Sequence, residues 1–85
     1  MEGNEEMIGW ERKPHYLLDY LLKTYKIRND ADLAKRLGVR PPHISKIRNR
    51  RMKMGAGLII EIHEEFEISI KEVKEMLAQS GQDGY

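Results

Sequence analysis

The sequence predicts an all-α domain of about five short helices, and three observations support this prediction. Several segments carry apolar residues three and four positions apart, which is the spacing of one helix face. Prolines, glycines and capping residues stand at the ends of these segments, where helices start and stop. No run alternates between apolar and polar residues for long enough to indicate a strand. With 85 residues the chain forms one small domain, which excludes a large enzyme fold.

The first two helices are expected over residues 14–25 and 30–37. Pro14 suits a first helical position because it lacks an N–H and has a fixed φ. Asn29 can cap the second helix, and Gly38 ends it. The broad apolar face of the first helix consists of Leu17, Leu18, Leu21, Leu22 and Tyr25.

Three more helices follow, and two of them have clear start signals. Pro41 and Pro42 fit only at a helix entrance, because neither has an N–H and a proline deeper inside would break the helix. Ser69 and Glu72 form a capping box at the start of the fifth helix. The fourth helix is expected to bury Leu58, Ile59, Ile62 and Phe66, and the fifth Ile70, Val73 and Leu77.

The ends of the chain differ in composition from its middle. They are polar and contain several glycines, so we expect a flexible N-terminal arm (1–13), a helical domain (14–78) and a flexible tail (79–85). Trp10 in the arm is expected to pack on the edge of the domain.

The near-neutral net charge of +1 hides an uneven distribution. Residues 28–54 contain nine Lys and Arg against two Asp, a net charge of +7. Residues 1–27 have a net charge of −1, and residues 55–85 have one of −5. A basic middle between acidic ends is typical of a domain that presents one face to a polyanion. A solvated charged surface can carry the same pattern, so charge alone does not decide the function.

The second and third helices share a more specific pattern. Two helices that cross steeply need a small residue at their contact, a turn residue that tolerates positive φ, and aliphatic residues that return to a common core. Ala34, Gly38 and Ile44 meet these three needs. The full motif core is Leu33, Ala34, Leu37, Gly38, Val39, Ile44 and Ile47.

This motif resembles the helix-turn-helix of the Cro/CI-type (XRE) repressors, and the five-helix plan resembles the lambda-repressor-like DNA-binding domain. The resemblance covers residues 16–77. It implies that the second motif helix, starting near Pro41, lies in the major groove with its N-terminal residues toward the base edges. By the same resemblance, the base-reading residues are Pro41, Pro42, His43, Ser45 and Lys46.

The expected DNA backbone contacts surround this helix. They come from Asn29, Asp30, Arg40, Arg48, Asn49, Arg50, Arg51 and Lys53. Lys46 can donate to guanine O6 and N7, whereas the two prolines offer only apolar contacts. Members of the family often have a glycine where Arg50 stands. If this turn requires a positive φ, Arg50 costs about 1 kcal/mol there, and Asn49 is better suited to that conformation.

The sequence offers no set of residues for catalysis, a cofactor or a metal ion. It contains no Cys, and its single histidines on helices, His15 and His63, are better explained as packed or solvated side chains than as metal ligands. Met52 and Met54 are expected to fill gaps beneath the loop that follows the third helix. We therefore expect neither an enzyme nor a cofactor.

The expected function is that of a sequence-specific, double-stranded-DNA-binding transcriptional regulator of phage or bacterial type, most simply a repressor. One reading helix makes few base contacts, so we expect a homodimer on a pseudo-palindromic operator. Met76 and Leu77, or the N-terminal arm, are the candidate dimer contacts. The longest aliphatic run, residues 58–60, is far below the roughly 20 residues of a membrane span, and a cytoplasmic, nucleoid-associated protein is expected.

Two alternatives stay open at this point. The chain could be an antitoxin, which binds DNA and also holds a toxin protein through its arm or tail. It could instead be an interaction module that has lost specific DNA binding, with its acidic fourth and fifth helices facing a basic protein partner.

Overall fold

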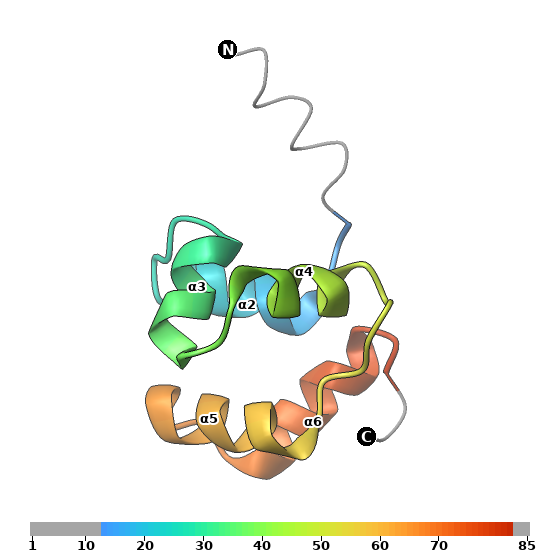
Figure 1. Cartoon of the computed structure of the whole chain (residues 1–85). Coiled ribbons are helices and arrows are strands. Elements are labelled where there is room, and N and C mark those ends of the chain that lie inside the picture. Colours follow the sequence, from blue (N-terminus) through green and yellow to red (C-terminus); the bar gives the residue numbers. More distant parts are fainter. Residues whose placement is uncertain (1–12, 83–85) are drawn as a thin grey trace.

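The computed structural model describes residues 13–82, which form five helices and no strand, so the predicted all-α class is confirmed. The helices are α2 (Tyr16–Thr24), α3 (Asp30–Leu37), α4 (Pro41–Arg48), α5 (Ala56–Phe66) and α6 (Ile70–Gln79). In Figure 1, α2, α3 and α4 form one group, and α5 and α6 lie beneath it. Because α4 lies at the front of the upper group, one side of it is turned away from the rest of the domain.

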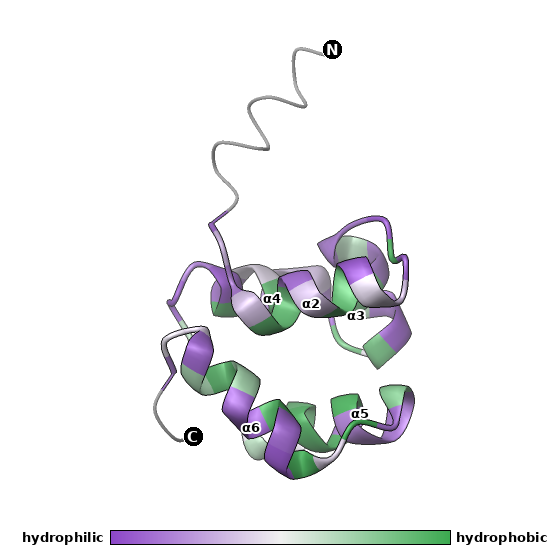
Figure 2. Ribbon diagram, turned by 180° about the vertical axis from the view of Figure 1, so that it is seen from behind, coloured by the Kyte–Doolittle hydropathy of each residue, from purple (hydrophilic) through white to green (hydrophobic). Residues whose placement is uncertain are grey.

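One hydrophobic core joins the two groups, and every described helix contributes to it. Figure 2 shows hydrophobic residues on the sides of the helices that face the interior. The buried core consists of Leu17, Leu18, Leu21, Leu22, Leu33, Ala34, Leu37, Ile44, Ile47, Met54, Leu58, Ile59, Ile62, Phe66, Ile68, Val73 and Leu77. The apolar faces predicted from the sequence are therefore largely those that the fold buries, with Tyr25, Val39 and Ile70 only partly buried against the core.

Four of the predicted helix boundaries are confirmed, and each has a local cause. Asn29 accepts a hydrogen bond from the Asp32 N–H at 2.8 Å and so caps α3. Gly38 ends α3 in the left-handed conformation, with a φ of 75°. Pro41 occupies the first position of α4, with Pro42 behind it. Ser69 accepts a hydrogen bond from the backbone N–H of residue 72 at 3.0 Å and so caps α6.

The first helix starts two residues later than the expected position at Pro14. His15 is its N-cap, in an extended conformation, and the Nδ1 atom of His15 accepts a hydrogen bond from the Leu18 N–H at 3.2 Å. The Leu17 N–H is satisfied from outside the helix, because it donates to the Oγ atom of Ser80 at 2.9 Å. A contact across 63 residues thus helps to fix this boundary, which is why local sequence signals misplaced it.

The C-terminal boundary expected at residue 78 also moves. Gln79 is still helical, and Ser80 is buried between α2 and its own helix, where it donates to the Met76 carbonyl at 2.8 Å. Gln82 is paired through its side-chain amide with both the N–H and the carbonyl of Met54, at 2.8 and 2.9 Å. Residues 79–82 are therefore part of the packed domain and not a loose tail. The rest of the expected tail, and the arm up to residue 12 with Trp10, lie outside the described residues.

Leu77 is not available as a dimer contact. Its side chain is 2% exposed and belongs to the core, because it lies on the same face of α6 as Val73. Met76 is partly buried and packs against the same core.

Candidate nucleic-acid interface

The exposed side of α4 carries all five predicted base-reading residues. Ile44 and Ile47 are buried and fix the inner side of the helix against α3 and the core. Their spacing of three residues, with Arg48 buried on the same side, turns the opposite side of the helix outward. Pro41, Pro42, Ser45 and Lys46 are exposed, and His43 is half-buried. The fold therefore brings these side chains together on one surface.

The start of α4 is unusually poor in hydrogen-bond donors. Pro41 and Pro42 have no N–H, and the N-cap residue, Arg40, makes no side-chain capping bond. The first backbone N–H of the helix belongs to His43, and it already donates to the Arg40 carbonyl at 2.9 Å. This helix end consequently presents apolar ring surface, and any polar recognition must come from side chains.

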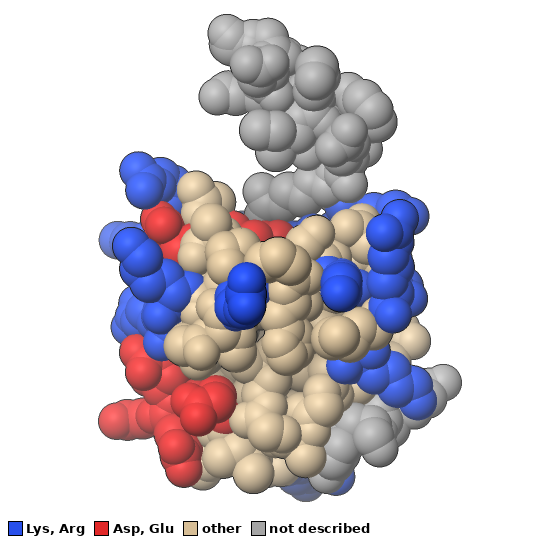
Figure 3. Space-filling model, viewed as in Figure 1, with Lys and Arg blue, Asp and Glu red and all other residues tan. Residues whose placement is uncertain are grey.

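Cations lie both over α4 and beside it. Figure 3 shows a largely uncharged surface on the side that carries α4, interrupted by Lys or Arg side chains, with further Lys and Arg on both flanks. The larger group of acidic side chains in this view lies lower down, beside the end of α5, and others lie along the upper edge. A surface that carries cations over α4 and on both flanks is suited to contact with a polyanion.

At the start of α3, the Asn29 Oδ1 atom caps the helix and the Asp30 carboxylate is held by Arg48. Asp30 can therefore approach a phosphate only through its backbone. Asn29 is exposed and also has the Nδ2 donors of its side chain.

Arg48 does not belong to the interface, although its charge suggested a phosphate contact. Its side chain is 4% exposed and donates to both oxygens of Asp30, at 2.7 and 2.9 Å. It also donates to the Asp19 carboxylate at 2.8 Å and to the Lys13 carbonyl at 2.7 Å. Burial by itself lowers the pKa of Arg48, but the hydrogen bonds and charges of Asp30 and then of Asp19 outweigh burial and raise it. The buried guanidinium thus links α2, α3 and α4 through its hydrogen bonds.

Arg50 also serves the fold. It adopts the left-handed conformation with a φ of 61°, whereas Asn49 has a φ of −88°, so the expectation that Asn49 takes this role is wrong. Asn49 instead donates through its Nδ2 atom to the Ser45 carbonyl at 3.0 Å. The Arg50 guanidinium donates to the carbonyls of Pro14, Arg48 and Ser80 at 3.0, 2.8 and 2.7 Å. These bonds offset the free-energy cost of the left-handed conformation, which is about 1 kcal/mol for a residue with a Cβ.

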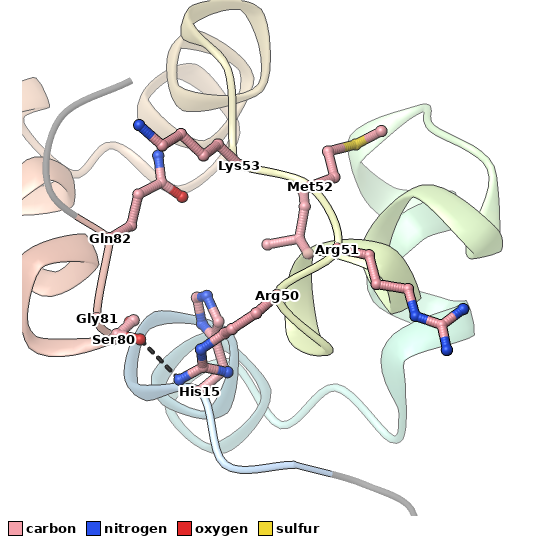
Figure 4. Close-up of a pocket in the computed structure, with 9 residues that line it drawn as sticks. His15, Arg50, Arg51, Met52, Lys53, Ser80, Gly81 and Gln82 are labelled. Carbon is pink, nitrogen blue, oxygen red and sulfur yellow. Dashed lines mark hydrogen bonds between the residues drawn. The ribbon is translucent and has the colours of Figure 1, made fainter.

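Four of the predicted backbone-contact cations are exposed around α4: Arg40, Arg50, Arg51 and Lys53. Of these, Arg50 already donates through its guanidinium to three backbone carbonyls. Figure 4 shows the hollow beside this loop, about 490 Å³ in volume, which His15, Arg50 and Ser80 help to line. Arg51 and Met52 point away from this hollow in the figure, so its cations do not converge on one ligand position. Arg51 is directed to solvent, where it can reach a phosphate.

Sequence reasoning missed two residues of this region. The sequence predicts only a packed or solvated side chain for His15, yet this residue caps α2 and is buried beside Arg48 and Arg50. Met52 was expected beneath the loop, and instead 39% of it is exposed, while Met54 fills the core as expected. Local spacing does not predict the cap at His15, because histidine is not among the side chains preferred at an N-cap and Pro14 offers a competing start signal. No sequence signal distinguishes the two methionines.

The burial of His15 predicts a pH-dependent stability. Desolvation, followed by the charges of Arg50 and Arg48, lowers the pKa of His15 to about 4 from its ordinary value of 6.5. Between these values the unfolded chain binds more protons than the folded one, so stability is full above pH 6.5 and is lost as the pH falls toward 4. Urea titrations from pH 7 to pH 4 are expected to show a loss of up to about 3 kcal/mol from this group.

The matched variant for this experiment is His15→Asn. Asparagine keeps an N-cap acceptor but does not titrate, so the variant is expected to lose less stability between pH 6.5 and pH 4 than the natural chain. Asn29→Ser is the control, because it exchanges one N-cap acceptor for another on α3 and removes no titratable group, so it is expected to leave the shape of the curve unchanged. Equal curves for His15→Asn and the natural chain would contradict this assignment.

Among residues 13–82, no three His, Cys, Asp or Glu side chains are grouped in a way that could hold a metal ion. No helix in the same range has the length and apolar character to cross a membrane. No protein-family model, curated protein or solved structure matches the chain.

Proposed function

We propose that the protein is a sequence-specific, double-stranded-DNA-binding transcriptional regulator that places α4 in the major groove. The observation that carries this proposal is the composition of the α4 surface: five side chains capable of base contact, Lys46 among them, on one exposed side of the helix, with exposed cations beside them. The helix-turn-helix of α3 and α4, with its αL glycine at position 38, supports a lambda-repressor-like domain as the scaffold. Repression by occupancy of an operator in the bacterial cytoplasm is the simplest form of this function.

The proposal includes a homodimer on a pseudo-palindromic operator. One eight-residue helix makes few base contacts, so a second copy is needed for operator affinity. The half-sites would then lie about 34 Å apart, one turn of DNA. Sedimentation with and without the selected operator tests this part separately from sequence preference.

The decisive experiment is selection from random double-stranded oligonucleotides with the full chain. A regulator enriches one sequence with two related halves. An interaction module that has lost specific binding enriches none, and that result would reject the proposal. Co-purification of a toxin protein together with an enriched sequence would make the protein an antitoxin that regulates its own operon.

The two kinds of cation are expected to respond differently to substitution. Lys46→Met removes a donor facing the bases and should relax sequence preference at one position by about 1–3 kcal/mol. Arg51→Met removes a phosphate contact, so it should weaken binding to all sequences alike and reduce the salt slope by about one. Arg48 is buried and the Arg50 guanidinium is already bonded to three carbonyls, so about three phosphates per subunit are expected, at a slope of roughly −0.9 for each.

Lys71→Met is the matched control for both variants, because Lys71 is an exposed lysine on α6. It should leave both affinity and salt slope unchanged. Titrations of the selected operator and of its single-base variants at several salt concentrations distinguish the outcomes. Identical effects of Lys46→Met and Arg51→Met would contradict the division of the surface into base-reading and phosphate-binding parts.

A further inference from the structure

Met52 is a large apolar side chain that the fold leaves on the surface, next to α4. It follows the loop residues Arg50 and Arg51 and is 39% exposed, whereas Met54, two residues on, is fully buried. An exposed methionine at this place has no role in the core. Its neighbours suggest what it contacts.

Met52 lines a shallow hollow of about 510 Å³ that opens on the α4 surface. The hollow is bounded by Val39, Arg40, Pro42, His43, Lys46 and Met52. Three segments contribute to it: the turn before α4, the first turns of α4 and the loop after it. It lies among the predicted base-reading residues, and it is distinct from the hollow of Figure 4.

The chemistry of this hollow combines apolar side chains with positive charge. Val39, Pro42 and Met52 present no hydrogen-bond donor from their side chains, and Pro42 lacks the backbone N–H as well. Arg40 and Lys46 add two cations. A matching ligand therefore combines an apolar group with nearby negative charge. In the major groove only the C5-methyl group of thymine is apolar, and it lies beside a phosphate backbone.

We propose that this hollow receives the C5-methyl group of one thymine in each half-site, and that Met52 is a specificity-determining residue for that thymine. The inference rests on the proposed DNA-binding function and deepens it. Methionine suits this position because its flexible, polarizable side chain adapts to a small apolar group. The neighbouring cations hold the DNA backbone while the apolar contact selects the base.

The test uses the selected operator and duplexes in which each thymine is replaced singly by uracil, which removes only the methyl group. For the natural chain, uracil at one thymine of the half-site is expected to weaken binding about fourfold, the effect of removing one buried methyl group from an apolar site. Met52→Gln keeps the length of the side chain but makes its end polar. This variant is expected to bind the thymine and uracil duplexes equally at that position.

Ile60→Gln is the matched control, because Ile60 is an exposed apolar residue (46%) on α5, outside the hollow. It should keep the fourfold preference for thymine. A fourfold effect that persists in Met52→Gln, or the absence of any effect of uracil in the natural chain, overturns the inference and leaves the proposed function intact. If no sequence is enriched from random oligonucleotides, both the proposed function and this inference are rejected.

Discussion

Replacing Arg48 by alanine is expected to lower the free energy of unfolding by about 3 kcal/mol, the largest effect of any charged residue in the domain. The guanidinium is almost fully buried and is bonded to Asp30, Asp19 and the Lys13 carbonyl. Its removal leaves the Asp30 carboxylate, with 24% of its side chain exposed, without its main cationic partner. It also removes the hydrogen bonds that join the end of α4 to α2 and α3.

Urea denaturation followed by circular dichroism measures this loss. Arg51→Ala is the matched control, because Arg51 is an exposed arginine three residues further along and should change stability by less than about 0.5 kcal/mol. A double-mutant cycle with Asp30→Ala should give a coupling energy above about 1 kcal/mol. Equal stabilities of the Arg48→Ala and Arg51→Ala variants would show that the buried ion pair contributes nothing.

The second large effect is expected at Ile44, which holds α4 against α3. Its side chain is fully buried, and α4 has no side-chain N-cap, so the position of the helix depends on Ile44, Ile47 and Arg48. Ile44→Ala should lower the free energy of unfolding by about 3 kcal/mol through lost burial and a residual cavity. It should also weaken binding to every DNA sequence, because the whole reading surface shifts with the helix.

Ser45→Ala is the control for this experiment. Ser45 is the next residue of the same helix and is exposed, so its replacement should leave stability within about 0.5 kcal/mol of the natural chain. Thermal unfolding and denaturant titration of both variants separate the two positions. A loss below 1 kcal/mol in Ile44→Ala would mean that the site collapses around the cavity and that α4 is held by its other contacts.

The sequence predicted the helices well because their causes are local. The apolar residues of each helix lie within two turns of one another, and the residues that start and stop helices act on their nearest neighbours. Four or five neighbouring residues are enough to predict the roles of Gly38, of the proline pair at the start of α4 and of the Ser69 cap. The same holds for the candidate base-reading face, since the burial of Ile44 and Ile47 determines which side of α4 is exposed.

Side-chain roles that depend on distant residues could not be predicted in this way. Arg48 and Arg51 are equivalent by charge, but only Arg48 lies opposite the carboxylates of residues 19 and 30. Arg50 adopts the left-handed conformation because its guanidinium donates hydrogen bonds to carbonyls from both ends of the domain. Sequence spacing does not reveal these partners, because they come together only when the chain folds.

The sequence by itself determined an all-α chain, the order of its helices and the residues that would be buried, because short-range periodicity and capping specify these. Only the tertiary structure decided which cations stay exposed for a polyanion, that His15 is a buried cap, and that Met52 stands at the surface while Met54 fills the core. The physical reason is that exposure and pairing are properties of the packed domain, in which a side chain's partners lie 18 to 63 residues away along the chain.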